Sequence, residues 1–208
     1  MTDEQAMWRV QTQDDHRAFA QLVERWSGPI RDLCCRMTGD VHRGEDLKQE
    51  TFARIFEKRK AYRHTGRFST WLWRVALNVC YDELRRTRRR GEVPLEADEE
   101  PSLAAANALE ANGRSPDLDA AAQEEAELVR QALLRLPEIY RTVLVLRHYE
   151  NLKLAKIAEV LEIPEGTVNS RMAEGLARLT RILEPEFREH KSLKEKTAQD
   201  QPKETLVL

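Results

Sequence analysis

The chain has 208 residues, of which 34% are charged and 6% are aromatic. This length accommodates one ordinary domain or two small ones, and the composition favours helices with modest cores over a β-sandwich. No apolar run approaches the ~18 residues of a membrane-spanning helix, and the first residues are too polar for a signal peptide. We therefore expect a cytoplasmic protein without membrane insertion.

The formal net charge of −2 conceals a segregation of charge along the chain. Residues 1–92 carry a net charge of +5, residues 93–127 carry −9, residues 128–183 carry +3 and residues 184–208 carry −1. Two basic segments separated by an acidic one predict two contacts with nucleic acid and a connector that avoids it.

No pattern of catalytic or metal-binding residues is present. Cys34 and Cys35 are adjacent and, like Cys80, lack the spacing of a zinc or redox motif, so we interpret all three as small buried residues. Neither a phosphate-binding loop nor a nucleophile elbow occurs. The histidines are scattered: His16, His42, His64, His148 and His190. We expect no cofactor, no metal and no enzymatic activity.

Apolar residues in the first half recur at intervals of three and four, which predicts helices. The expected helices span residues 15–36, 45–62 and 71–90, the last of them capped by Ser69 or Thr70. No alternating strand pattern occurs, so the predicted fold class is all-α.

The composition changes after Gly91. Residues 93–115 are acidic, rich in alanine and short of large apolar side chains, which predicts a flexible linker. Ser115 as cap and Pro116 in the first helical position then begin a new helix. Further helices are expected at about 138–149, 154–161 and 167–183, followed by a polar tail that we expect to fray.

Residues 152–183 carry the most specific pattern, a helix-turn-helix. An apolar helix face is followed by the break Pro164-Glu165-Gly166, after which Thr167 is expected to cap a second helix. In this geometry the second helix enters a DNA major groove. Asparagine, arginine and alanine suit contacts with bases and phosphates. The candidate residues are Thr167, Asn169, Ser170, Arg171, Ala173, Glu174 and Arg178.

Four segments together resemble one family, the extracytoplasmic-function (ECF) sigma factors of RNA polymerase. In chain order they are GEDLKQETFARIFEK, FSTWLWRVALNVCYDELRRTRRR, LPEIYRTVLVLRHYENL and IPEGTVNSRMAEGLARL. The resemblance implies two small helical domains. Along the chain we expect a region-2-like domain (10–92), the acidic linker (93–115), a region-4-like helix-turn-helix domain (116–184) and a polar tail (185–208).

The resemblance also implies roles for the first domain. A helical face with Arg74, Asn78, Tyr81 and Arg85 suits phosphate contact and base stacking, and relatives use this surface for the downstream promoter element. The neighbouring loop, with Arg63, His64 and Arg67, lies where relatives hold a flipped base. An acidic face with Asp46, Gln49 and Glu50 is expected to bind core polymerase.

Departures from the family pattern occur in the helix-turn-helix. Asn169 and Glu174 stand where relatives often carry basic residues, which leaves the upstream promoter sequence open. Lys153 replaces a usual Ser/Thr cap, and Glu162 replaces a common helix-ending glycine, each at a local cost on the order of 1 kcal/mol.

We therefore expect a sigma factor that binds core RNA polymerase and promoter DNA, with an anti-sigma factor as a possible further partner. The alternative from the residues alone is an autonomous helix-turn-helix regulator that binds duplex DNA as a dimer. That alternative leaves residues 10–92 without a function.

Overall fold

The computed structural model of the chain describes residues 1–63, 66–91 and 116–199. Every regular element in these residues is a helix, which confirms the expected all-α class. The predicted linker, which ends at the expected cap residue Ser115, lies outside the described residues. We call residues 1–91 the first lobe and residues 116–199 the second lobe.

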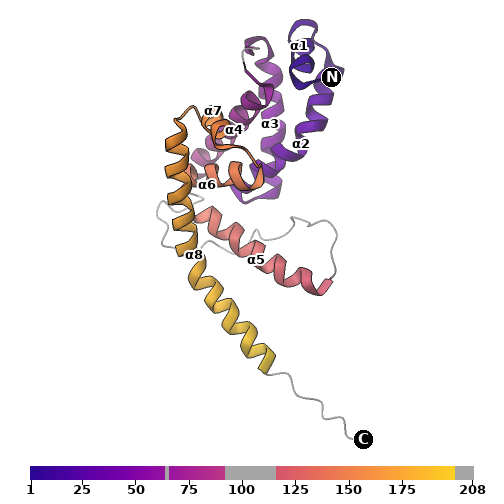
Figure 1. Cartoon of the computed structure of the whole chain (residues 1–208). Coiled ribbons are helices and arrows are strands. Elements are labelled where there is room, and N and C mark those ends of the chain that lie inside the picture. The colour runs from indigo at the N-terminus through magenta and orange to yellow at the C-terminus, as the bar shows by residue number, and fades with distance from the viewer. Residues whose placement is uncertain (64–65, 92–115, 200–208) are drawn as a thin grey trace, which may run out of the picture.

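The first lobe is a helical bundle (Figure 1). It contains α1 (Asp3–Gln13), α2 (His16–Thr38), α3 (Val41–Glu57), the 3-10 turn η1 (Arg59–Ala61) and α4 (Phe68–Arg89). The expected helix over 15–36 is confirmed as α2, whereas α3 begins four residues earlier than expected. Asp40 causes the earlier start because its carboxylate accepts a hydrogen bond from the Arg43 N–H at 3.0 Å.

Helix α1 was not expected, although a local signal for it exists. Thr2 and Gln5 form a capping box, in which each side chain bonds to the other residue's backbone N–H. Met7 and Val10 are fully buried, so α1 contributes to the core of the first lobe.

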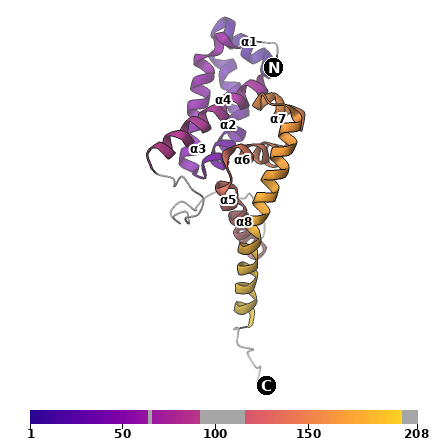
Figure 2. The same ribbon diagram turned by 90° about the vertical axis from the view of Figure 1, so that its left-hand side faces the viewer.

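The second lobe contains α5 (Pro116–Arg135), α6 (Glu138–Leu144), the π-helical turn η2 (Val145–Tyr149), α7 (Leu154–Leu161) and α8 (Glu165–Gln199). Helices α7 and α8 form the predicted helix-turn-helix. In both views α6 and α7 lie against the first lobe, while the far end of α8 extends away from it (Figure 1, Figure 2).

Other expected helix ends were also wrong, including that of α3, which ends at Glu57 rather than at residue 62. Helix α4 begins at Phe68, and its N-cap residue is Arg67 rather than Ser69 or Thr70. Helix α8 begins at Glu165, so Thr167 lies in its first turn and its N–H bonds to the Pro164 carbonyl. The same helix continues past residue 183 to Gln199, because the polar tail up to that point consists largely of residues that favour helices.

Lys153 and Glu162, which depart from the family pattern, flank α7 at its two ends, as expected from the sequence. Lys153 is the N-cap of α7 and makes no side-chain capping bond. Glu162 ends the helix in the left-handed conformation, with φ of 55°, which is strained for a residue other than glycine.

One apolar core continues from the first lobe into the second. Val143, Val145, Leu146 and Ile157 belong to the same buried cluster as the side chains of α2 and α4. Cys34, Cys35 and Cys80 are buried, as expected, and the Cys34 and Cys80 sulfurs lie 3.6 Å apart. The hydrogen bond to Cys80 together with burial raises the pKa of Cys34, and burial raises the pKa of Cys35 to about 11. Cys34 and Cys35 are therefore thiols of low reactivity.

Candidate nucleic-acid interface

Helix α4 carries the predicted DNA-contacting residues Arg74, Asn78, Tyr81 and Arg85, which we call the strand-binding stripe. Asn78 and Arg85 are exposed, while Arg74 and Tyr81 are half-buried. The stripe thus lies on one helix, as the spacing requires, but only part of it faces solvent.

The second lobe covers the remaining part of the stripe. The Arg74 guanidinium donates to the Glu159 carbonyl at 2.8 Å and forms an ion pair with Glu162 at 2.8 Å. The Tyr81 and Thr142 hydroxyls lie 2.9 Å apart. Burial raises the pKa of Tyr81, so its phenol remains neutral at physiological pH.

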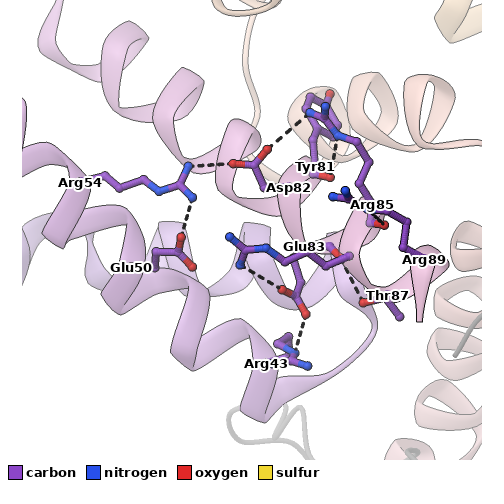
Figure 3. Close-up of polar contacts among 10 residues, drawn as sticks. Arg43, Glu50, Arg54, Tyr81, Asp82, Glu83, Arg85, Thr87 and Arg89 are labelled. Atoms are coloured by element: carbon purple, nitrogen blue, oxygen red, sulfur yellow. Dashed lines mark hydrogen bonds and ion pairs between the residues drawn. The ribbon is translucent and has the colours of Figure 1, made fainter. Parts of the chain in front are cut away.

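The C-terminal end of α4 presents a cluster of arginines. Arg85, Arg88 and Arg89 are exposed, and Arg88 forms an ion pair with Glu138 of α6 at 3.3 Å. Figure 3 shows Arg85 and Arg89 bonding to backbone carbonyls one turn earlier in the same helix. These cations therefore lie close to the helix surface, at the end where the helix dipole favours positive charge.

The predicted polymerase-binding residues Asp46, Gln49 and Glu50, which we call the grip face, lie on α3. Asp46 and Gln49 are exposed. Glu50 is half-buried and accepts a hydrogen bond from Arg54 at 2.6 Å. Arg54 also donates to Asp82 of α4 at 2.9 Å, so a chain of ion pairs connects the two helices (Figure 3).

Sequence reasoning missed Arg54 and Asp82. The four-residue spacing of Glu50 and Arg54 was a usable signal for the first ion pair, because such residues adjoin on a helix. The pairing with Asp82 depends on how α3 packs against α4, which no local spacing indicates.

The loop before α4 keeps its described basic residues accessible. Arg63 and Arg67 are exposed, whereas His64 lies outside the described residues. The ring centroids of Trp71 and Tyr62 lie 4.9 Å apart, and the Trp71 ring also packs edge-on against that of Phe68. Trp71 is half-buried and thus packs within this aromatic group.

The first turns of α8 carry the predicted base-reading residues. Asn169, Ser170 and Ala173 are exposed, while Thr167 and Arg171 are half-buried. Arg178 donates to Glu174 at 2.7 Å and lies over the Tyr140 ring, 4.8 Å from its centroid. Glu174 thus neutralises a cation that would otherwise be available to a phosphate.

Two further contacts between the lobes were not predicted. The buried Arg141 guanidinium donates to the Met37 carbonyl at 2.5 Å and to the Leu136 carbonyl at 2.9 Å. Arg36 of α2 pairs with Glu150 at 3.5 Å. Burial raises the pKa of Glu150 to about 7, opposed by Arg36 and reinforced by Asp32.

Comparison with known proteins agrees with this architecture. The family model for sigma-70 region 2 matches residues 22–90, and the model for sigma-70 region 4 matches residues 126–179. The first match covers most of α2 and all of α3 and α4, and the second covers the helix-turn-helix.

Curated relatives extend over most of the chain. The ECF RNA polymerase sigma factor SigW of Bacillus subtilis is 35% identical over 169 residues, which cover 81% of this chain and 90% of the relative. The RNA polymerase sigma-H factor of Pseudomonas aeruginosa is 33% identical over 188 residues, covering 90% and 96%. The chain belongs to the ECF family of RNA polymerase sigma factors.

Solved structures share the fold at lower identity. The sigma factor RpoE of Bartonella quintana, crystallised with the anti-sigma factor NepR, aligns with a TM-score of 0.60 at 22% identity over 80% of this chain and 96% of its own. CnrH, in complex with the cytosolic domain of CnrY, aligns with the same score and identity over 88% and 97%.

The described residues carry neither a membrane-spanning helix nor a metal-binding cluster. None of the helices there combines the length and apolarity needed to cross a bilayer. The same residues contain no cluster of three or more histidine, cysteine or acidic side chains that could hold a metal ion.

Proposed function

We propose that this chain directs RNA polymerase to a specific set of promoters and has no catalytic activity of its own. The region-2-like domain, expected over 10–92, binds core polymerase through the grip face and the downstream promoter element through the strand-binding stripe. The domain over 116–184 reads the upstream element through α8. Residues 93–115 connect them, and 185–208 form a tail. The observation that carries the proposal is the Arg/Asn/Tyr stripe on α4 in a chain that belongs to the ECF family.

Promoter binding in this proposal requires the two lobes to separate. Arg74 and Tyr81 cannot contact DNA while Glu162 and Thr142 occupy them. The contact between the lobes also buries apolar side chains, including Val143 and Leu146, so opening has a free-energy cost. Core polymerase, by binding the lobes at separate places, supplies the interaction that offsets this cost.

The proposed partners follow from the same surfaces. They are core RNA polymerase, promoter DNA and, because RpoE of Bartonella quintana was crystallised with the anti-sigma factor NepR, an anti-sigma factor. The proposed place of action is the cytoplasm, where these partners are found. No cofactor is needed for binding or strand capture.

Transcription reconstituted from purified core polymerase and a randomised promoter library tests the proposal. The chain should select a defined pair of sequence elements only when core polymerase is present. Tight binding of promoter duplex by the chain alone would instead support an autonomous helix-turn-helix regulator.

A single substitution tests the stripe. Asn78→Ala should reduce opening of the selected promoter, measured by permanganate reactivity of unpaired thymines, with little change in core binding. Gln21→Ala, which removes an exposed amide from α2, is the matched control. A normal bubble with Asn78→Ala contradicts the assignment.

A further inference from the structure

Helix α1 holds the beginning of the loop that precedes α4. The Gln11 side-chain amide donates to the Tyr62 carbonyl at 2.9 Å and to the Lys60 carbonyl at 3.2 Å. Both acceptors lie immediately before Arg63, a candidate DNA contact. One side chain of α1 therefore fixes the backbone where the chain enters this loop.

The same helix holds the end of the loop. The Phe68 N–H, the first of α4, donates to the Glu4 carboxylate at 3.3 Å. Arg67, the N-cap residue, makes no capping bond with its own side chain. Glu4 thus serves as a cap from another helix, at the end of α4 where the dipole favours an anion. The Tyr62 hydroxyl connects the two ends by donating to the Gly66 carbonyl at 3.2 Å.

Helix α1 is itself anchored independently of the loop. Its capping box fixes its first turn, and Asp3 accepts a hydrogen bond from the Trp26 indole at 3.0 Å and pairs with Arg25, both on α2. Glu4 and Gln11 are seven residues apart, or about two helical turns, so they project from the same side of α1. Helix α1 is thus held by α2 and contacts the backbone on both sides of the loop, through Gln11 and Glu4. We call this arrangement the bracket.

We propose that Glu4 and Gln11 are positioning residues that set where Arg63 and Arg67 present their cations to the unpaired promoter strand. This inference rests on the proposed function, because it extends binding of the downstream promoter element from the strand-binding stripe to Arg63 and Arg67 before α4. Neither residue needs to touch DNA. Loss of either contact frees the backbone beside Arg63 or Arg67, so base discrimination at the position that these two cations read should fall.

Selection from a random pool measures that discrimination. Holoenzyme is incubated with single-stranded DNA randomised over the melted segment, and the bound molecules are sequenced. Glu4→Ala and Gln11→Ala should each lower the preference at the same position by about fivefold or more, leaving neighbouring positions unchanged. Glu4→Gln keeps an acceptor for the Phe68 N–H and should restore most of the preference.

Asp40→Ala is the matched control, because it also removes a capping carboxylate, but from α3. Unchanged preferences with Glu4→Ala overturn the proposal. The proposal is also overturned if Glu4→Ala lowers the base preference at every position and Asp40→Ala does the same, because that pattern indicates general destabilisation.

Hydrogen exchange gives a second readout that does not depend on DNA. In Glu4→Ala the Phe68 amide should exchange at least about tenfold faster, as expected for a lost capping bond, whereas amides in the middle of α4 should not change. Equal exchange rates of the Phe68 amide in wild type and Glu4→Ala would refute the assignment of Glu4 as the cap of α4. If wild-type holoenzyme enriches no sequence, the proposed function fails, and the exchange measurement still decides whether α1 positions the loop.

Discussion

The hydroxyl of Tyr81 on α4 lies 2.9 Å from the hydroxyl of Thr142 on α6. A side chain suited to stacking on an unpaired base is therefore bonded to the other lobe of the same chain. Asn78 and Arg85 are already exposed, but the complete strand-binding stripe is available only after this contact breaks. The strength of the hydroxyl contact therefore bears on how readily the chain opens.

Thr142→Val should shift the chain towards separated lobes. Valine keeps the shape of threonine but cannot bond to Tyr81, and one hydrogen bond contributes about 1 kcal/mol, or about a fivefold change in the equilibrium. Fluorescence transfer between labels on cysteines introduced at the exposed Gln21 and Arg181 measures the separation, since the native thiols are buried.

Thr87→Val is the control for this experiment, because the Thr87 hydroxyl donates to the Glu83 carbonyl within α4. Its transfer efficiency should equal that of the wild type. Identical efficiencies for wild type and Thr142→Val over a urea series would show that the hydroxyl pair does not hold the lobes together.

Glu150 should make the stability of the closed chain depend on pH. Burial raises its pKa from 4.5 to about 7 in the folded chain, so between these values the unfolded chain has lost a proton that the folded chain keeps. Stability therefore falls as pH rises through this interval, by roughly 1–3 kcal/mol. Glu150→Gln should lack this component.

Urea unfolding of both proteins at about pH 5 and about pH 8 checks the sign and the size of this effect. Glu159→Gln, which alters an exposed carboxylate on α7, should behave as the wild type does. An equal pH dependence for wild type and Glu150→Gln would rule out the assignment.

Asp46→Lys should weaken binding to core polymerase by about tenfold, since it reverses a charge on the exposed grip face. The fold should persist, because Asp46 is exposed. This variant is cleaner than Glu50→Lys, which also removes a partner of Arg54. Glu57→Lys makes the same charge change at the exposed end of α3, and equal pull-down of core by both variants would contradict the prediction.

Glu174→Arg should raise the affinity of holoenzyme for promoter DNA and steepen its salt dependence by roughly one to two phosphate equivalents. The change removes a carboxylate and releases Arg178 from its 2.7 Å ion pair. Glu184→Arg applies the same charge change further along α8. Titration over a range of potassium chloride concentrations is the measurement, and an unchanged slope would place Glu174 away from DNA.

The elements of this fold were largely predictable because helical periodicity is local. The stripe on α4, the helix-turn-helix and the strained Glu162 were all readable from residue spacing and type. Helix α1 was missed although Thr2 and Gln5 gave a signal, because its few apolar residues make a weak periodic pattern.

The contact between the lobes was not predictable from the same patterns. Glu150 and Arg36 are far apart in sequence, and nothing local distinguishes either from an ordinary surface charge. Arg141 sits in a segment matched to the family, yet its bond to the Met37 carbonyl depends on the packing of α6 against α2. Which predicted DNA contacts are covered therefore required the three-dimensional arrangement.

Within the described residues, three ion pairs join the lobes, and in each of them the first lobe supplies the cation and the second lobe the carboxylate. Arg36, Arg74 and Arg88 belong to the first lobe, and their partners are Glu150, Glu162 and Glu138 of the second. The second lobe thus offers the first what a nucleic acid would offer, a row of anions. In the proposed function a phosphate replaces Glu162 at Arg74, which is the member of these pairs that belongs to the strand-binding stripe, and the cation that leaves the DNA there is matched by one that gathers at the freed carboxylate. Promoter capture is then an ion exchange, less sensitive to salt than its number of phosphate contacts implies.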